Sequence, residues 1–257
     1  MEFVQYNVQQ RVATITLNRP EKRNALSYEL VAELKEAFST ASHDADVKVI
    51  ILNANGDAFC AGADLGYLQQ LQGFSYDENL QDSAHLKELF LSIYTHPKIV
   101  IAQVQGHALA GGCGLATVCD FVFAVPQAKF GYTEVKIGFI PALVMVFLLR
   151  KIGEGRAKEL LLSGELYPAE QVLSMGLINK IVSPEKLAEE VNAFALKLAQ
   201  SNSAQSMMLT KQMIGKVQSL PLEEALRYAS EMNAHARNTE DCKRGIAAFL
   251  NKEKLSW

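Results

Sequence analysis

The chain has 257 residues, a formal net charge of −3, and 49% hydrophobic against 21% charged residues. This composition is that of an ordinary globular protein with a sizeable core, and the length suits one large domain or a domain with an appended segment. The acidic balance, without any cluster of lysine and arginine, excludes nucleic-acid binding driven by charge.

The cysteines and the N-terminal sequence point to a protein of the cytoplasm. The four cysteines show neither CxxC nor histidine-paired spacing, so we expect reduced thiols and no metal site. No basic segment followed by an apolar one opens the sequence, and no apolar run is long enough to span a bilayer. We therefore expect a soluble, cytoplasmic protein with no membrane partner.

Strands and helices alternate through the first part of the chain. Apolar alternation and β-branched runs predict strands at 11–18, 47–52, 99–104 and 121–125. Apolar spacing of three and four predicts a helix from an N-cap at Ser27 to about Thr40, and another near 81–95. The Gln-, Gly- and Tyr-rich stretch 65–80 is interpreted as a mobile loop or a loose helix. This alternation favours an α/β fold with layered sheets.

Helices dominate beyond about residue 184. The apolar spacing predicts helices at 185–199, 204–217, 222–236 and 239–250. We therefore divide the chain into a core at 1–195 and a C-terminal helical segment at 196–257. This segment either closes the site of its own domain or forms a subunit interface, and the sequence leaves both alternatives open.

Two glycine-containing turns are the main functional signals. In VQGHALAGGCGLATVCD (104–120), Gly111 and Gly112 open a helix directly after a strand and a first turn, which leaves backbone N–H groups unpaired. In FCAGADL (59–65), small residues likewise let a ligand approach the main chain. Together the two turns can supply one N–H each to a single carbonyl oxygen. The alternative for the second turn is a tight strand-to-helix connection with Asp64 as a helix cap.

These two segments, together with LNRPEKRNAL (17–26) and AKFGYTEVKIGFIP (128–141), resemble the enoyl-CoA hydratase/isomerase (crotonase) family. The resemblance covers roughly residues 4–215 in the right order and spacing. It implies a crotonase-like ββα spiral core with a C-terminal helical segment, which forms a homotrimer or a dimer of trimers. It also implies an acyl-CoA thioester substrate, with no cofactor because CoA is part of that substrate.

The resemblance assigns roles to individual residues. Ala61 and Gly111 match the two positions whose N–H groups form the oxyanion hole around the thioester carbonyl, and Glu134 matches the glutamate that acts as general acid/base. The positions expected to hold the substrate, chiefly its CoA portion, are Arg23, Ala25, Ala61, Gly62, Ala63, Asp64, Leu65 and Gly111. Lys22 and Arg23 either contact CoA phosphates or are simply solvated. Residues 65–80 and 141–148 are expected to line the acyl pocket.

The surroundings of Glu134 are consistent with this role. Apolar residues on both sides, among them Phe130, Val135 and Ile137, predict desolvation that raises the pKa of the carboxyl group towards a useful value. The alternative is an exposed glutamate that begins a helix and interacts favourably with the helix dipole.

Gly114 occupies the position where hydratases of the family usually carry a second glutamate. A single carboxylate suits a proton shuttle that moves a double bond from the 3- to the 2-position, so isomerisation of an enoyl-CoA is favoured. Hydration of a 2-enoyl-CoA, including branched substrates such as methylglutaconyl-CoA, stays open, as does a non-catalytic acyl-CoA-binding protein. The other candidates for a replacement acid are not persuasive; they are Asp64, Tyr67, Tyr76, His107, Cys113, Cys119 and Tyr132.

Overall fold

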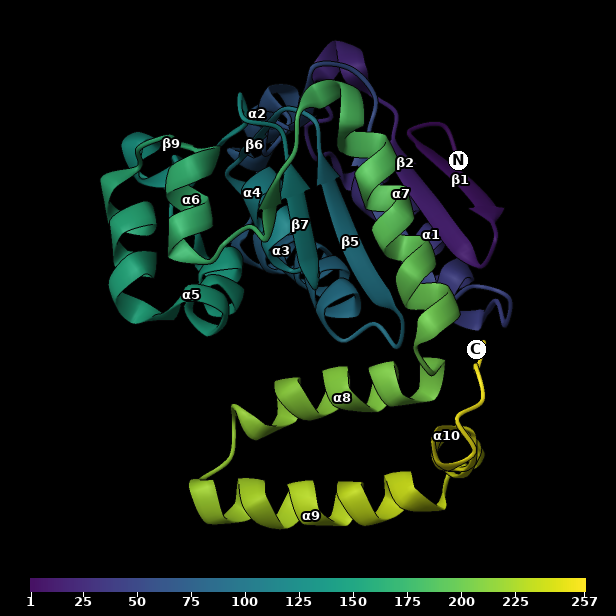
Figure 1. Cartoon of the computed structure of the whole chain (residues 1–257). Helices are drawn as coiled ribbons and strands as arrows, with labels where there is room; N and C mark the ends of the chain where they lie inside the picture. Colours follow the sequence, from purple (N-terminus) through teal and green to yellow (C-terminus); the bar gives the residue numbers. More distant parts are fainter.

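The computed structural model describes all residues from 1 to 257, and it has an α/β fold built on two sheets (Figure 1). The larger sheet has the strand order β1-β2-β3-β5-β7-β10. Its strands are β1 (Val4–Gln9), β2 (Val12–Leu17), β3 (Val49–Ala54), β5 (Ile99–Val104), β7 (Phe121–Ala124) and β10 (Lys180–Ile181). Only β1 is antiparallel to its neighbour, and the central strands are nearly continuous apolar runs because both of their faces are buried.

A second, smaller sheet has the order β4-β6-β8-β9. Its strands are β4 (Ala58–Cys60), β6 (His107–Leu109), β8 (Lys129–Gly131) and β9 (Tyr167–Pro168). The first three are parallel to one another, and β9 closes the sheet in the antiparallel direction. Strands of three residues carry too little alternation to be recognised, which is why the sequence did not predict them individually.

The chain visits the two sheets in turn and then forms a helix. β3 and β4 are followed by α2 (Leu65–Leu71) and α3 (Tyr76–Tyr94), β5 and β6 by α4 (Gly111–Thr117), and β7 and β8 by α5 (Ala142–Ser163). This repetition confirms the expected ββα spiral. Because β4, β6 and β8 are parallel neighbours, the segments that leave their carboxyl ends meet at one edge of the small sheet.

Helices cover the sheets through apolar faces. α1 (Tyr28–His43) begins at the predicted cap, where the Leu30 N–H donates to Ser27 Oγ at 3.3 Å, and it packs against α3. α7 (Pro184–Ser201) lies across the larger sheet, and α6 (Ala169–Met175) precedes β10 (Figure 1). The stretch 65–80 is mostly helical, since α2 fills its first half and a capping box of Ser75 and Glu78 starts α3.

The C-terminal helices form a separate layer below the core (Figure 1). They are α8 (Ala204–Val217), α9 (Leu222–Asn238) and α10 (Glu240–Leu250), and they contact one another. α7 continues through residue 195 to Ser201, so the division expected at 195/196 falls inside a helix that belongs to the core. The chain leaves the core at Asn202 instead. None of the helices combines the length and apolar character needed to cross a lipid bilayer.

Candidate active site

Three segments that follow parallel strands meet at one edge of the small sheet. Residues 61–64 follow β4, Gly111 follows β6, and Glu134 follows β8 as the first residue of the short 3-10 helix η2 (Glu134–Ile137). The strand registers bring them together, because Cys60 pairs with Ala108 and Leu109 pairs with Gly131. The structure thus collects the predicted turns and the predicted glutamate in one place.

Glycine is required where the two turns touch. A Cβ at Gly112 would lie 2.2 Å from the carbonyl oxygen of Cys60, and one at Gly62 would lie 3.0 Å from the Cβ of Ala110. Gly62 also has φ of +96°, a conformation that L side chains rarely adopt. The two backbone turns therefore approach each other closely only because both positions lack a side chain.

The N–H of Gly111 is available to a ligand. Gly111 is the first residue of α4, so its N–H has no acceptor within the helix, and no other group of the chain accepts from it. The preceding residue, Ala110, has the strained values φ 49° and ψ −123°, and its own N–H donates to the Gly131 carbonyl at 2.7 Å. Strain of this kind persists where the surroundings fix the backbone, as at many functional sites.

The structure corrects the expectation for Ala61. Its N–H donates to the carbonyl of Arg23 at 3.0 Å, so this amide is already engaged within the chain. Two residues further on, the Leu26 N–H donates to Gly62 and the Asp64 N–H donates to Leu26, while the intervening N–H of Ala63 has no acceptor. The free amide of this turn is therefore that of the exposed Ala63 and not that of Ala61. Ala63 lies in a short extended segment bridged to Leu26, in which the N–H groups of Ala61 and Asp64 are bonded within the chain and that of Ala63 is not.

A buried asparagine that the sequence analysis missed holds this region together. Asn24 is fully buried; its side-chain NH2 donates to the carbonyls of Asn55 at 2.8 Å and Ala58 at 2.9 Å, and its oxygen accepts from the Arg19 N–H at 2.9 Å. It fixes the loop after the 3-10 helix η1 (Pro20–Lys22) against β4. Asn24 has a left-handed φ of 53°, and the preference of asparagine for such positions in polar loops was the available signal.

Of the remaining predicted substrate-binding residues, two are exposed to solvent, and the other two are buried and bonded within the chain. Arg23 and Leu65 have exposed side chains next to the turn, with Leu65 82% exposed. Ala25 is buried, and its carbonyl accepts from the Arg19 side chain. Asp64 caps α2 by accepting from the Tyr67 N–H at 3.1 Å, and it pairs with Arg19 at 2.8 Å. Burial opposes ionisation of Asp64, but these partners hold its pKa below the usual range, so it fits the role of a helix cap.

Glu134 has the environment expected of a proton-transfer group. Its side chain is half-buried, and its Oε2 atom is buried without any hydrogen-bond partner. Burial raises the pKa of Glu134, partly offset by a hydrogen bond from its own backbone N–H. A carboxyl oxygen that is buried yet unpaired has its bonding capacity free for a substrate atom.

A second buried contact links the element that carries Glu134 to the helix that carries Gly111. The hydroxyl of Tyr132 lies 2.8 Å from Thr117 Oγ1, and Thr117 also donates to the Cys113 carbonyl at 2.8 Å. Tyr132 is fully buried, so this pair sits in an environment where hydrogen bonds are strong. It fixes the segment leaving β8 relative to α4.

The place where a side chain at position 114 would project is filled. A Cβ at Gly114 would lie 2.1 Å from Val144 Cγ1 and 3.3 Å from Phe90 Cζ. Val144, in the first turns of α5, is buried at this position. An apolar wall therefore stands where a second carboxylate would have to project.

The other candidates for a replacement acid are engaged or inert. Burial raises the pKa of the Cys113 and Cys119 thiols to about 12. His107 Nδ1 accepts from the Lys129 N–H, and the Tyr67 hydroxyl donates to Asp82. Tyr76 is exposed at the start of α3. No group of three or more His, Cys, Asp or Glu side chains is arranged to hold a metal ion.

The ββα spiral places the chain in the class of proteins with the crotonase fold. The family model described as "Enoyl-CoA hydratase/isomerase" matches residues 7–257. The chain belongs to this family, and it is an enzyme that acts on an acyl-CoA substrate.

Individual relatives agree with this assignment. A "Putative enoyl-CoA hydratase" of Thermus thermophilus is 44% identical over 241 residues, which are 94% of this chain and 95% of the relative. A "Crotonyl-CoA hydratase" of Syntrophomonas wolfei is 34% identical over 97% of this chain and 95% of its own length. The crystal structure of a "putative enoyl CoA hydratase/isomerase (crotonase)" from Legionella pneumophila matches with a TM-score of 0.90 and 38% identity, covering 98% of both chains.

Proposed function

We propose that this enzyme isomerises a 3-enoyl-CoA to a 2-enoyl-CoA, with Glu134 carrying the proton and the N–H groups of Ala63 and Gly111 binding the thioester oxygen. The observation that carries the proposal is the buried, unpaired Oε2 of Glu134 at the sheet edge that also presents both free amides. The reaction needs no cofactor, since the CoA thioester itself makes the C2 proton acidic.

The proposed steps balance with one carboxylate. Glu134 removes a proton from C2 of the 3-enoyl thioester, and the electron pair moves onto the carbonyl oxygen to give a dienolate. The two amides stabilise this oxyanion, and each such donor contributes roughly 3–4 kcal/mol in comparable sites. Protonated Glu134 then returns the proton to C4, and the double bond ends between C2 and C3. The raised pKa of Glu134 favours both transfers.

The apolar wall at Val144 supports isomerisation over hydration. Adding water across a double bond requires a group that orients and deprotonates the water as well as one that protonates C2. With Gly114 bare and Val144 packed against it, no second carboxylate faces Glu134 there. Excluding water also protects a dienolate from side reactions.

A second candidate, hydration of a 2-enoyl-CoA, is favoured by the relatives, since those from Thermus thermophilus and Syntrophomonas wolfei carry hydratase names. Branched substrates such as methylglutaconyl-CoA belong to this candidate. Glu134 would then have to orient water and transfer the proton alone. A non-catalytic acyl-CoA-binding protein is the third candidate, and the desolvated Glu134 argues against it because such a group is costly to keep without a use.

The exposed side chains near the turn fit the CoA portion of the substrate. Arg23 carries a positive charge beside the residues that present the amides, and Leu65 offers an exposed apolar surface. We also propose a homotrimer or a dimer of trimers, because the C-terminal helices expose large apolar side chains that water alone would not favour. These are Leu222, Leu226, Ile246, Phe249 and Leu250.

The test supplies 3-enoyl-CoA and 2-enoyl-CoA in parallel to the wild-type protein, Glu134→Gln and the control Glu170→Gln, an exposed glutamate on α6. We expect conversion of the 3-enoyl substrate, lost by at least about a hundredfold in Glu134→Gln and unchanged in the control. If the 2-enoyl substrate is hydrated fast and this hydration depends on Glu134, the proposed function is hydration and not isomerisation. Near wild-type activity of Glu134→Gln on both substrates would refute the site.

A further inference from the structure

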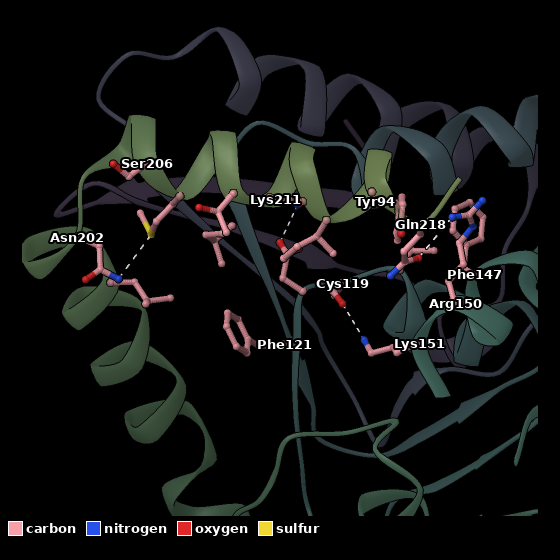
Figure 2. Close-up of a pocket in the computed structure, with 18 of the residues that line it drawn as sticks. Tyr94, Cys119, Phe121, Phe147, Arg150, Lys151, Asn202, Ser206, Lys211 and Gln218 are labelled. Carbon is pink, nitrogen blue, oxygen red and sulfur yellow. Dashed lines mark hydrogen bonds and ion pairs between the residues drawn. The ribbon is translucent and has the colours of Figure 1, made fainter. Parts of the chain in front are cut away.

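A cavity lies between α8 and the core, and none of residues 61–64, Gly111 and Glu134 lines it (Figure 2). Its volume is about 840 Å³, which is in the range of small-molecule binding sites. α4 separates it from the active site, since Gly111 lies at the start of that helix and Thr117, at its end, lines the cavity. The two ends of such a helix are about 10 Å apart.

One end of the cavity carries cationic groups whose bonding capacity is incompletely used. Lys151 Nζ donates to the carbonyls of Thr117 at 3.0 Å and Cys119 at 2.8 Å, but no carboxylate lies within ion-pair distance, and an ammonium has three N–H groups to donate. Arg150, its neighbour, makes only one long contact of 3.4 Å, to Gln218. Burial lowers the pKa of Lys151, and the nearby Asp120, which pairs with Lys211, offsets this lowering only in part.

The other cation of the cavity differs from these two. Lys211 Nζ pairs with Asp120 at 2.7 Å and also donates to the carbonyls of Ile93 and Lys98, so its three N–H groups are all used. The free donors therefore belong to Arg150 and Lys151. Figure 2 shows Arg150, Lys151 and Gln218 grouped at one end of the cavity.

Away from this end, polar residues such as Asn202 and Ser206 line the cavity beside an apolar part (Figure 2). Phe121, Leu198 and Met207 contribute to it, and so does Trp257, whose backbone N–H donates to the Gln200 carbonyl and thereby holds the C-terminus against the core. An occupant that suits both ends needs one anionic headgroup and one apolar chain. A planar guanidinium beside an ammonium matches a carboxylate headgroup.

We propose that this cavity binds an amphiphilic monocarboxylate, such as a free fatty acid, with its carboxylate at Arg150 and Lys151 and its alkyl chain along Phe121, Leu198 and Met207. The cavity includes Phe147 from the segment 141–148 that is expected to line the acyl pocket, and α4 lies between its Thr117 end and the turn that carries Gly111. The proposal does not depend on which reaction the enzyme catalyses.

Trp257 provides the test, because it is the only tryptophan of the chain and lines the cavity. Octanoate is titrated into the intact protein while the fluorescence of Trp257 is followed, with octanol and acetate as ligands that lack the charge or the chain. The variants are Arg150→Gln and Lys151→Met. The control is Lys158→Met in the part of α5 that follows the non-helical Gly153; its side chain is 61% exposed and pairs with Glu154.

We expect a saturable change with octanoate, an apparent Kd raised about tenfold or more in Arg150→Gln and Lys151→Met, and no shift in the control. Arg150 is exposed, so Arg150→Gln keeps the test valid even where Lys151→Met unfolds. Saturating butyryl-CoA, which occupies the acyl-CoA site, is expected to leave the octanoate signal unchanged.

Several results would overturn the proposal. One is the absence of a saturable fluorescence change, which is also the result expected if a second copy of the chain fills the cavity. The others are binding of octanol as tight as that of octanoate, wild-type affinity for octanoate in Arg150→Gln, and displacement of octanoate by butyryl-CoA.

Discussion

The packing of Val144 against Gly114 makes a quantitative prediction about stability. The substitution Gly114→Ala would place a Cβ 2.1 Å from Val144 Cγ1, whereas carbon atoms in contact prefer about 3.5–4.0 Å. One of the two groups must therefore move by more than an ångström in a close-packed region. Overpacking of this kind costs about 1–3 kcal/mol, and it outweighs the gain of up to about 1 kcal/mol that alanine brings over glycine in a helix.

In a protein that also carries Val144→Ala, Gly114→Ala should no longer destabilise the fold. By itself, Val144→Ala removes two buried methyl groups and costs about 1–3 kcal/mol. In that background the new methyl of Gly114→Ala enters vacated space, so its effect should be neutral or stabilising by up to about 1 kcal/mol. The coupling between the two substitutions is thus expected at about 1–3 kcal/mol.

The assay is thermal unfolding of the four proteins in this cycle at one protein concentration. For a chain of this size, 1 kcal/mol corresponds to a shift in Tm of about 2–4 °C. Gly155→Ala on α5 is the matched control, because no atom lies within 4 Å of the position that a Cβ would take there, and the substitution should not destabilise. An equal cost of Gly114→Ala in both backgrounds would show that Val144 does not fill the space beside Gly114.

Three further predictions concern residues around the site. Because burial raises the pKa of Glu134, its ionised form destabilises the fold at pH values above that pKa. Glu134→Gln should therefore raise Tm at pH 7–8, and the gain should shrink as the pH falls and the carboxyl is protonated, as calorimetry over this range can check. Asn24→Ala removes three buried hydrogen bonds and should cost about 2–4 kcal/mol in urea unfolding, and a loss below about 0.5 kcal/mol would contradict the role of Asn24 as a clamp. Tyr132→Phe removes the hydroxyl bound to Thr117, which should cost about 0.5–1.5 kcal/mol of stability, and kcat should fall several-fold while KM changes little; an unchanged kcat would mean that this bond does not position Glu134.

The long elements of the fold were predictable because their patterns span several periods. The helix at 204–217 was predicted with the bounds that α8 has, and the central strand 99–104 with those of β5. The three-residue strands β4, β6 and β8 were not individually predictable. They exist because they pair with one another across about 20 to 50 residues of sequence, and such pairing leaves no local periodicity.

In the candidate site, too, some residues could be predicted from the sequence and others could not. The segment carrying Gly111 could be found from the sequence because a glycine-rich turn has a local signature, whereas Glu134 was singled out by the family resemblance, since an exposed glutamate at the start of a helix has a similar local pattern. The choice between Ala61 and Ala63 could not, because it depends on which N–H groups Arg23 and Leu26 engage from a distant loop. The apolar wall likewise depends on Val144, which comes from another helix 30 positions away in the chain.

Glu134 joins these observations into one physical argument. Its buried Oε2 lacks a partner, and leaving a polar atom in that state costs about 1–3 kcal/mol of folding stability. The fold tolerates this cost because the Tyr132–Thr117 bond holds the segment that carries Glu134 against α4. A group kept in this state without a use would be replaced by an apolar side chain at a gain in stability. The unpaired carboxyl is therefore the feature of the structure that most directly supports the proposed proton transfer.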